Sequence, residues 1–128
     1  MLLDTHVWTW MLTNDPKLSR RALEAAEMAE TVRLSPISIF EISQKVRLGK
    51  WPDMEPHLER LPAIAADQGL LTAPFSAEVA LLAGNMPWPH RDPFDRIIAA
   101  TAVLSGATLL SSDTMFDTLD EGGLQRIW

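Results

Sequence analysis

Short apolar runs alternate with longer segments of helical periodicity along the whole chain, and this alternation restricts the fold more than any other feature. A short apolar run bounded by turn residues is typical of a buried strand, whereas apolar residues that recur every three or four positions indicate a helix. Strand–helix–strand repeats favour a parallel sheet covered by helices. We therefore predict an α/β fold with a mainly parallel sheet of four to five short strands, at 1–4, 31–34, 70–75, 107–110 and 124–128.

Capping residues followed by proline mark the starts of several helices. This pattern occurs at Asp15-Pro16, Ser35-Pro36 and Asp92-Pro93. Gly49 and Gly106 are in position to end the helices that begin at the second and third of these sites. We expect helices within 5–12, 17–30, 35–49, 54–68 with a break near Pro62, 76–85 and 92–106.

Length and composition fit one globular domain. A chain of 128 residues with 47% apolar and 22% charged residues supports one core rather than two, so we expect a single domain over 1–128. Cysteine is absent, which excludes disulfides, thiolate zinc sites and a cysteine nucleophile. The apolar runs are shorter than the roughly 20 residues of a membrane span. The first residues, MLLDTH, lack the basic segment of a signal peptide, so we expect a soluble, cytoplasmic protein.

The charge balance limits how this chain can contact nucleic acid. Lys and Arg number 11 against 17 Asp and Glu, which gives a formal net charge of −6. A general nucleic-acid coat is excluded because such proteins are usually basic. Contact with a polyanion would therefore require a local basic patch or bound metal ions. The acidic excess also suits a basic partner.

Five acidic residues lie where a parallel sheet of this kind would bring them together. Asp4 ends the first expected strand and Asp113 follows the fourth, while Asp92 and Asp95 begin a helix and Glu41 lies in the helix after Ser35. Ligand sites of such sheets lie outside the carboxyl ends of the strands. A carboxylate cluster there would bind hard divalent cations, and two such ions can activate water against a phosphodiester.

Each acid also has a purely structural explanation. The D-P-F-D segment that contains Asp92 and Asp95 resembles a helix capping box. Asp4 and Asp113 are in position to cap the segments that follow them, and Glu41 could lie on a solvated helix face. Both interpretations remain open for each residue taken alone.

Several segments of the chain together resemble one known family. They are MLLDTHVW, SPISIFEISQKVRLGK, HRDPFDRIIAATA and TLLSSD. Over nearly its whole length the sequence is similar to PIN-domain ribonucleases, specifically VapC-type toxins of type II toxin–antitoxin pairs. The resemblance implies a three-layer α/β/α fold and an Mg²⁺- or Mn²⁺-dependent endoribonuclease that cleaves single-stranded or loop RNA. It also implies a cognate antitoxin and a homodimer.

The resemblance assigns roles to the acids by motif. Asp4, Glu41, Asp95 and Asp113 match the catalytic residues that hold the metal, with Glu41 either binding a second ion or orienting the attacking water. Because water rather than the RNA 2′-hydroxyl is the nucleophile, 5′-phosphate and 3′-hydroxyl ends are expected. Residues expected near the site or the substrate are Thr5, Asp92, Ser111 or Ser112, Arg91 and Arg96.

Other residue types leave alternatives open. The basic residues near the acids are either phosphate contacts or a solvated surface: Lys45, Arg47, Lys50, Arg91 and Arg96. The tryptophans either pack in the core or stack on bases: Trp8, Trp10, Trp51, Trp88 and Trp128. The three histidines fit structural or surface roles, and His90 is the best placed of them for substrate contact.

Two other functions compete with the nuclease. An inactive PIN scaffold would bind RNA or an antitoxin without cleaving RNA. An aspartyl-phosphate phosphatase would use Asp4 as its nucleophile, but such enzymes carry a second Asp two residues later, where this chain has His6. A P-loop enzyme is excluded because the G-x-x-x-x-G-K-[ST] pattern is absent.

Overall fold

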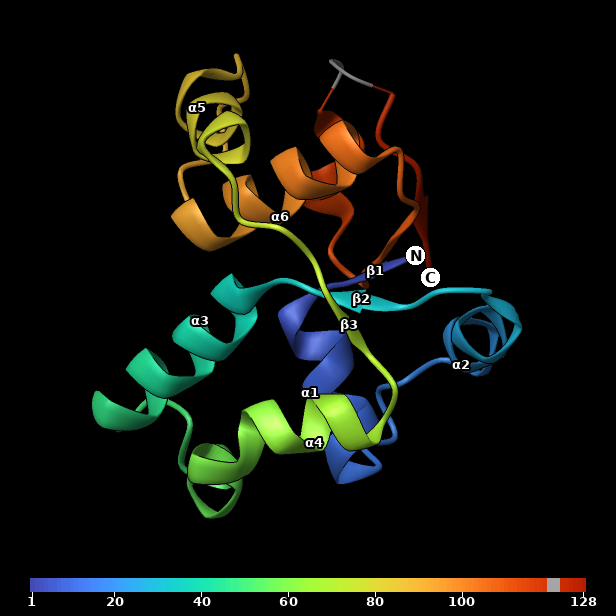
Figure 1. The fold of residues 1–128 in the computed structure, drawn as a ribbon, viewed down its shortest axis with the longest axis vertical. Helices are drawn as coiled ribbons and strands as arrows, with labels where there is room; N and C mark the ends of the chain where they lie inside the picture. Colours follow the sequence, from blue (N-terminus) through green and yellow to red (C-terminus); the bar gives the residue numbers. More distant parts are fainter. Residues whose placement is uncertain (120–122) are drawn as a thin grey trace.

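A five-stranded parallel sheet lies at the centre of the computed structural model, which describes residues 1–119 and 123–128. The strand order is β3-β2-β1-β4-β5, so the first strand of the chain is the central one (Figure 1). The strands are β1 (Leu2–Leu3), β2 (Arg33–Leu34), β3 (Leu71–Thr72), β4 (Leu109–Leu110) and β5 (Arg126–Ile127). The predicted α/β class and parallel sheet are confirmed.

Helices cover both faces of this sheet and make a three-layer arrangement (Figure 1). The helix α6 packs with α5 over one face, and α1 lies on the opposite face with α2, α4 and the 3₁₀ helix η1. The helices are α1 (Thr5–Thr13), α2 (Arg20–Met28), α3 (Pro36–Arg47), α4 (Leu61–Asp67), α5 (Ala77–Asn85) and α6 (Pro93–Ser105), with 3₁₀ helices η1 (Pro52–Arg60) and η2 (Thr114–Thr118).

Adjacent leucines of the central strands serve two separate cores. Leu2 packs with the α5–α6 side, and its neighbour Leu3 packs with the α1–α3 side. The paired strand β4 repeats the pattern with Leu109 and Leu110. Successive strand residues point to opposite faces, and here both faces are covered. Two consecutive leucines per strand therefore suffice to join three layers.

Most of the predicted helix boundaries are confirmed. Side-chain oxygens of Ser35, Ser76 and Asp92 accept backbone N–H bonds at the starts of α3, α5 and α6. Gly106 takes a left-handed φ of 59° directly after α6, a conformation that favours glycine. The expected break near Pro62 is the junction of η1 and α4 at Leu61.

The prediction that a helix starts at Asp15-Pro16 is wrong. The Asp15 carboxylate accepts the Lys17 N–H and closes a turn, and α2 begins only at Arg20 with Ser19 as its capping residue. Asx turns of this kind compete with the helix for the same backbone groups. The expected strand at 70–75 is also shorter than predicted, since only Leu71–Thr72 pair with β2 before Pro74.

Candidate active site

The candidate site lies at the carboxyl edge of the sheet, where the chain order reverses between β1 and β4. Asp4 follows β1 directly, and its amide donates to the Leu110 carbonyl at the end of β4. From β1 the next strands in sequence extend to one side, whereas β4 and β5 lie on the other. Ligand-binding crevices of open α/β sheets form at such a switch point.

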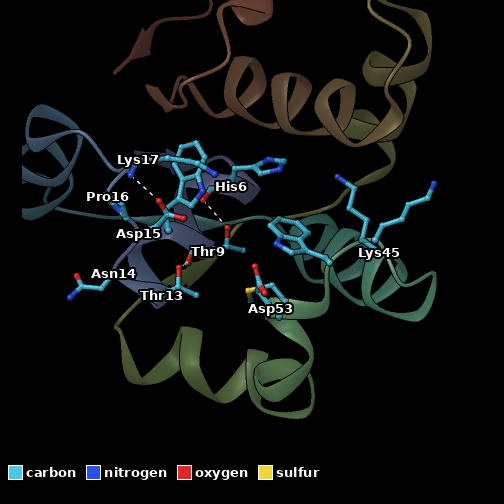
Figure 2. A pocket seen from close by; sticks show the side chains of 13 residues that line it. His6, Thr9, Thr13, Asn14, Asp15, Pro16, Lys17, Lys45 and Asp53 are labelled. Carbon is cyan, nitrogen blue, oxygen red and sulfur yellow. Dashed lines mark hydrogen bonds between the residues drawn. The ribbon is translucent and has the colours of Figure 1, made fainter.

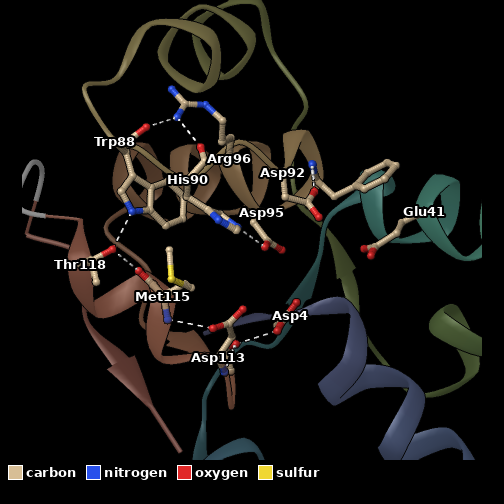
Figure 3. Close-up of polar contacts among 12 residues, drawn as sticks. Asp4, Glu41, Trp88, His90, Asp92, Asp95, Arg96, Asp113, Met115 and Thr118 are labelled. Carbon is tan, nitrogen blue, oxygen red and sulfur yellow. Dashed lines mark hydrogen bonds and ion pairs between the residues drawn. The ribbon is translucent and has the colours of Figure 1, made fainter.

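Five carboxylates project toward the same region of this edge (Figure 3). They come from four parts of the fold: the end of β1, the helix α3, the start of α6 and the loop after β4. The residues are Asp4, Glu41, Asp92, Asp95 and Asp113. The topology therefore brings together all of the acids that the sequence singled out.

Asp4 is buried and held in place by a serine. Its side chain accepts a bond from the Ser111 hydroxyl at 2.6 Å, and Ser111 in turn accepts the Asp113 N–H at 3.1 Å. Burial raises the pKa of Asp4, and the nearby Glu41 carboxylate adds to this, while Ser111 opposes it. A buried carboxylate of this kind gains from a cation beside it.

Asp95 is half-buried, and its carboxylate has a raised pKa. Burial raises the pKa of Asp95 to about 6, and the charges of Asp92 and Asp4 contribute in the same direction. Its Oδ2 lies 2.6 Å from His90 Nε2. In a capping box Asp95 would instead bond the backbone N–H of Asp92. The observed partner is the His90 ring, so the structure does not show that capping arrangement.

Glu41 is buried rather than solvated. Its side chain points from α3 toward the other acids (Figure 3). Lys45 Nζ lies 2.5 Å from its Oε1. The alternative of a solvated helix face is therefore wrong. Glu41 and Lys45 are four residues apart on one helix, and this spacing is the sequence pattern that indicates such an ion pair.

Asp92 and Asp113 do act as caps. Asp92 Oδ1 accepts the Phe94 N–H at 2.8 Å, and Asp113 Oδ1 accepts the Met115 N–H at 2.8 Å at the start of η2. Each cap uses one carboxylate oxygen, and a carboxylate can accept further bonds through the other. Capping therefore does not exclude a second role.

The hydroxyl residues near the site hold it together from behind. Ser111 is fully buried and links Asp4 to Asp113, which makes it rather than the half-buried Ser112 the hydroxyl that contacts the acids. Thr5 donates to the Ser38 hydroxyl at 3.0 Å and so ties α1 to α3, the helix that carries Glu41. Sequence reasoning did not identify Ser38.

The two arginines expected near the substrate differ in their exposure and contacts. Arg91 is exposed in the loop before α6. Arg96 does not fit a phosphate contact, because its guanidinium already donates to four backbone carbonyls. One is that of Ala83 in the last turn of α5, and three lie in the α5–α6 connection: Met86, Trp88 and His90. This fork of donors makes Arg96 an organiser of the loop that carries His90.

The carboxylates are the type of ligand that a hard divalent cation prefers, but they are not arranged as a complete metal site. Carboxylate oxygens are the ligands that Mg²⁺ and Mn²⁺ prefer. Across residues 1–119 and 123–128, no three acidic, histidine or cysteine side chains already have the arrangement of a metal site. Instead, Lys45 forms an ion pair with Glu41, and the His90 ring hydrogen-bonds to Asp95. Binding of a cation would therefore involve small side-chain rotations and competition with these partners.

A family model described as the PIN domain matches residues 1–122. This chain belongs to the PIN-domain family. The ribonuclease VapC22 of Mycobacterium tuberculosis is 32% identical to this chain over 115 residues, which cover 88% of this chain and 86% of that protein. Membership in this family favours a nuclease role for the acidic residues over a role in an aspartyl-phosphate phosphatase.

Solved structures share the fold. The VapBC2 structure from Rickettsia felis, bound to a DNA fragment from the promoter, aligns with a TM-score of 0.71 at 20% identity and covers 99% of this chain and 98% of that chain. The FitAcB structure from Neisseria gonorrhoeae aligns with a TM-score of 0.66 at 24% identity and covers 99% and 96%. At these identities the likeness shows the PIN-like architecture alone.

Proposed function

We propose that this PIN domain is an Mg²⁺- or Mn²⁺-dependent endoribonuclease and the toxin of a type II toxin–antitoxin pair. The observation that carries the proposal is the convergence of Asp4, Glu41 and Asp95 at the switch point of the sheet, two of them buried and one half-buried. The similarity to a ribonuclease over most of both chains supports the choice of RNA as substrate.

In this proposal Asp4, Asp95 and Asp113 hold the metal, and Glu41 either joins them or orients the attacking water. When bound, Mg²⁺ or Mn²⁺ supplies positive charge that neutralises the scissile phosphate and makes water a stronger acid. Ser111 fixes the rotamer of Asp4, and His90 does the same for Asp95. Lys45 balances the charge of Glu41 until a cation takes its place.

The partners and location belong to the same proposal. Solved structures with this fold include VapBC2 from Rickettsia felis and VapBC-1 from Haemophilus influenzae, which supports the cognate antitoxin that the VapC-like sequence implies. A cationic side chain of that antitoxin, placed among the acids, would compete with the metal. We propose a homodimer that acts in the cytoplasm, where its RNA substrates are. In the part of the chain that the structure describes, no helix is long and apolar enough to cross a membrane.

Purified, partner-free protein should cut a panel of structured and single-stranded RNAs when Mg²⁺ or Mn²⁺ is present. EDTA should stop the reaction, because the acids would then repel the scissile phosphate. Gel analysis of end-labelled RNA measures this directly. Cleavage that continues equally in EDTA would contradict the metal mechanism, and no cleavage with either ion would favour the inactive scaffold.

The ends of the products test the choice of nucleophile. Attack by water should leave 5′-phosphate and 3′-hydroxyl ends, and a 2′-deoxy substitution at the cleaved nucleotide should leave the reaction largely intact. Products that carry a 2′,3′-cyclic phosphate would show that the RNA itself supplies the nucleophile.

Expression of this chain alone should arrest bacterial growth, and co-expression of the small protein encoded beside it should restore growth. Growth curves with parent protein and with Asp4→Asn measure the effect, since the variant should be harmless at equal abundance. Normal growth despite RNA cleavage in vitro would remove the toxin assignment and leave the nuclease assignment in place.

A further inference from the structure

A second feature lies beside the acids but shares almost none of their residues. It is a cavity of about 600 Å³ between α1, the turn that follows it and the α3–η1 segment (Figure 2). We call it the aromatic pocket and define it by six of its lining residues: His6, Trp10, Lys17, Lys45, Lys50 and Trp51. The proposed cleavage chemistry uses none of them directly.

Three aromatic rings form one wall of the aromatic pocket. The rings of His6 and Trp51 are stacked, with centroids 4.9 Å apart and planes 27° apart. The centroid of Trp10 lies 6.0 Å from that of His6. His6 is exposed, and both tryptophans are half-buried, so the wall is accessible to a ligand. Stacking on such side chains is how proteins bind unpaired bases.

Lysine side chains lie close to these aromatic rings. Lys45 Nζ lies 5.4 Å from the Trp51 ring centroid, and Lys17 Nζ lies 5.9 Å from that of Trp10. Asp15 and Asp53 also line the cavity. Lys17, Lys45 and Lys50 line the cavity beside these two acids, and Lys45 is also paired with Glu41. The lysines place ammonium groups next to the rings, where they can contact phosphates.

The aromatic pocket adjoins the candidate active site through two residues. Lys45 reaches Glu41 at 2.5 Å and also lies over Trp51. His6 follows Asp4 by two residues, in the first turn of α1. A strand of RNA that crosses the acids could therefore place its next nucleotide in this pocket.

We propose that the aromatic pocket binds one nucleotide of single-stranded RNA next to the cleaved bond. The base stacks on the wall formed by His6, Trp10 and Trp51, and the lysines contact the flanking phosphates. The naming of RNA as the ligand rests on the proposed nuclease function. Aromatic rings with ammonium groups close to them suit a nucleotide, which has both a base and phosphates, better than an apolar peptide, which has no anionic group for the lysines.

The test uses a single-stranded RNA hexamer and the full chain in EDTA, where cleavage does not occur. The indole N–H signals of the tryptophans are followed by NMR. Trp10 and Trp51 should shift on RNA addition. Trp8 and Trp88 are internal controls, because their buried indoles already donate to Gln68 and Thr118.

Variants separate stacking from general attraction. Trp51→Leu should weaken RNA binding about tenfold, and Trp51→Phe should retain most of it because a ring remains. Lys50→Gln should weaken binding and reduce its salt dependence, whereas Arg60→Gln, an exposed change outside the cavity lining, should do neither. Thermal melts confirm that each variant is folded.

The outcomes distinguish this inference from the nuclease assignment. RNA that binds without shifting Trp10 and Trp51, or that binds Trp51→Leu as well as the parent, would overturn the nucleotide pocket. Signals that respond only to an antitoxin peptide would assign the pocket to a protein partner instead. If RNA shifts both indoles but is not cut with Mg²⁺ or Mn²⁺, the pocket stands and the nuclease assignment fails.

Discussion

Asp95→Asn should lower RNA cleavage by about a thousandfold or more while leaving the metal-free protein at least as stable as the parent. The substitution removes one charge from the proposed metal-holding set and nearly preserves the side-chain shape. Loss of one such ligand removes several kcal/mol of transition-state stabilisation. The stability result has a separate cause, which is the buried position of the carboxylate.

Burial raises the pKa of Asp95 to about 6, well above its ordinary value of 3.8. The folded protein therefore binds more protons than the unfolded chain between these values, and its free energy of unfolding falls as pH rises through them. The ionised carboxylate costs at most about 3 kcal/mol at neutral pH. Asp95→Asn lacks this cost, so its advantage over the parent should be absent below pH 4, grow between pH 4 and 6, and be complete above pH 6.

Denaturant titrations of both proteins at several pH values in EDTA measure this difference. Mg²⁺ at a hundred times its dissociation constant should then stabilise the parent by about 2.7 kcal/mol and the variant by much less. Asp95 as a mere helix cap predicts the opposite result, with mild destabilisation and nearly intact cleavage. A variant that still cuts RNA and a parent that Mg²⁺ does not stabilise would together remove Asp95 from the site.

Arg96→Met should destabilise the fold by about 3 kcal/mol or more, which corresponds to a drop in Tm of roughly 10 °C. The methionine keeps much of the side-chain length but removes every donor. Four carbonyls, one in the last turn of α5 and three in the α5–α6 connection, then lose their shared partner. Arg96→Lys should rescue only part of the loss, because one ammonium group lacks the planar fork that reaches all four.

Arg91→Met is the matched control for this experiment. Arg91 is exposed in the same loop, so its substitution should change the free energy of unfolding by less than about 0.5 kcal/mol. Thermal melts of the three variants beside the parent measure the comparison. Equal stability of Arg96→Met and Arg91→Met would show that the carbonyl contacts do not hold the loop.

The sequence by itself determined the elements and the set of acids. Capping at Ser35, Ser76 and Asp92 depends on backbone groups within three residues of the cap, so a local pattern is enough to predict it. The apolar runs predicted the parallel sheet, and the acids that follow them predicted its functional edge. The failure at Asp15-Pro16 was also local, because the same side chain suits a turn and a helix start.

Only the tertiary structure decided which groups meet. Asp4 and Ser111 are 107 residues apart and touch because β1 pairs with β4, a choice made by the packing of two cores rather than by either segment. The same holds for the aromatic pocket, where His6 meets Trp51 across two helical segments. Burial then set the pKa of Asp95, since desolvation depends on every neighbour and not on the residues next to it in sequence.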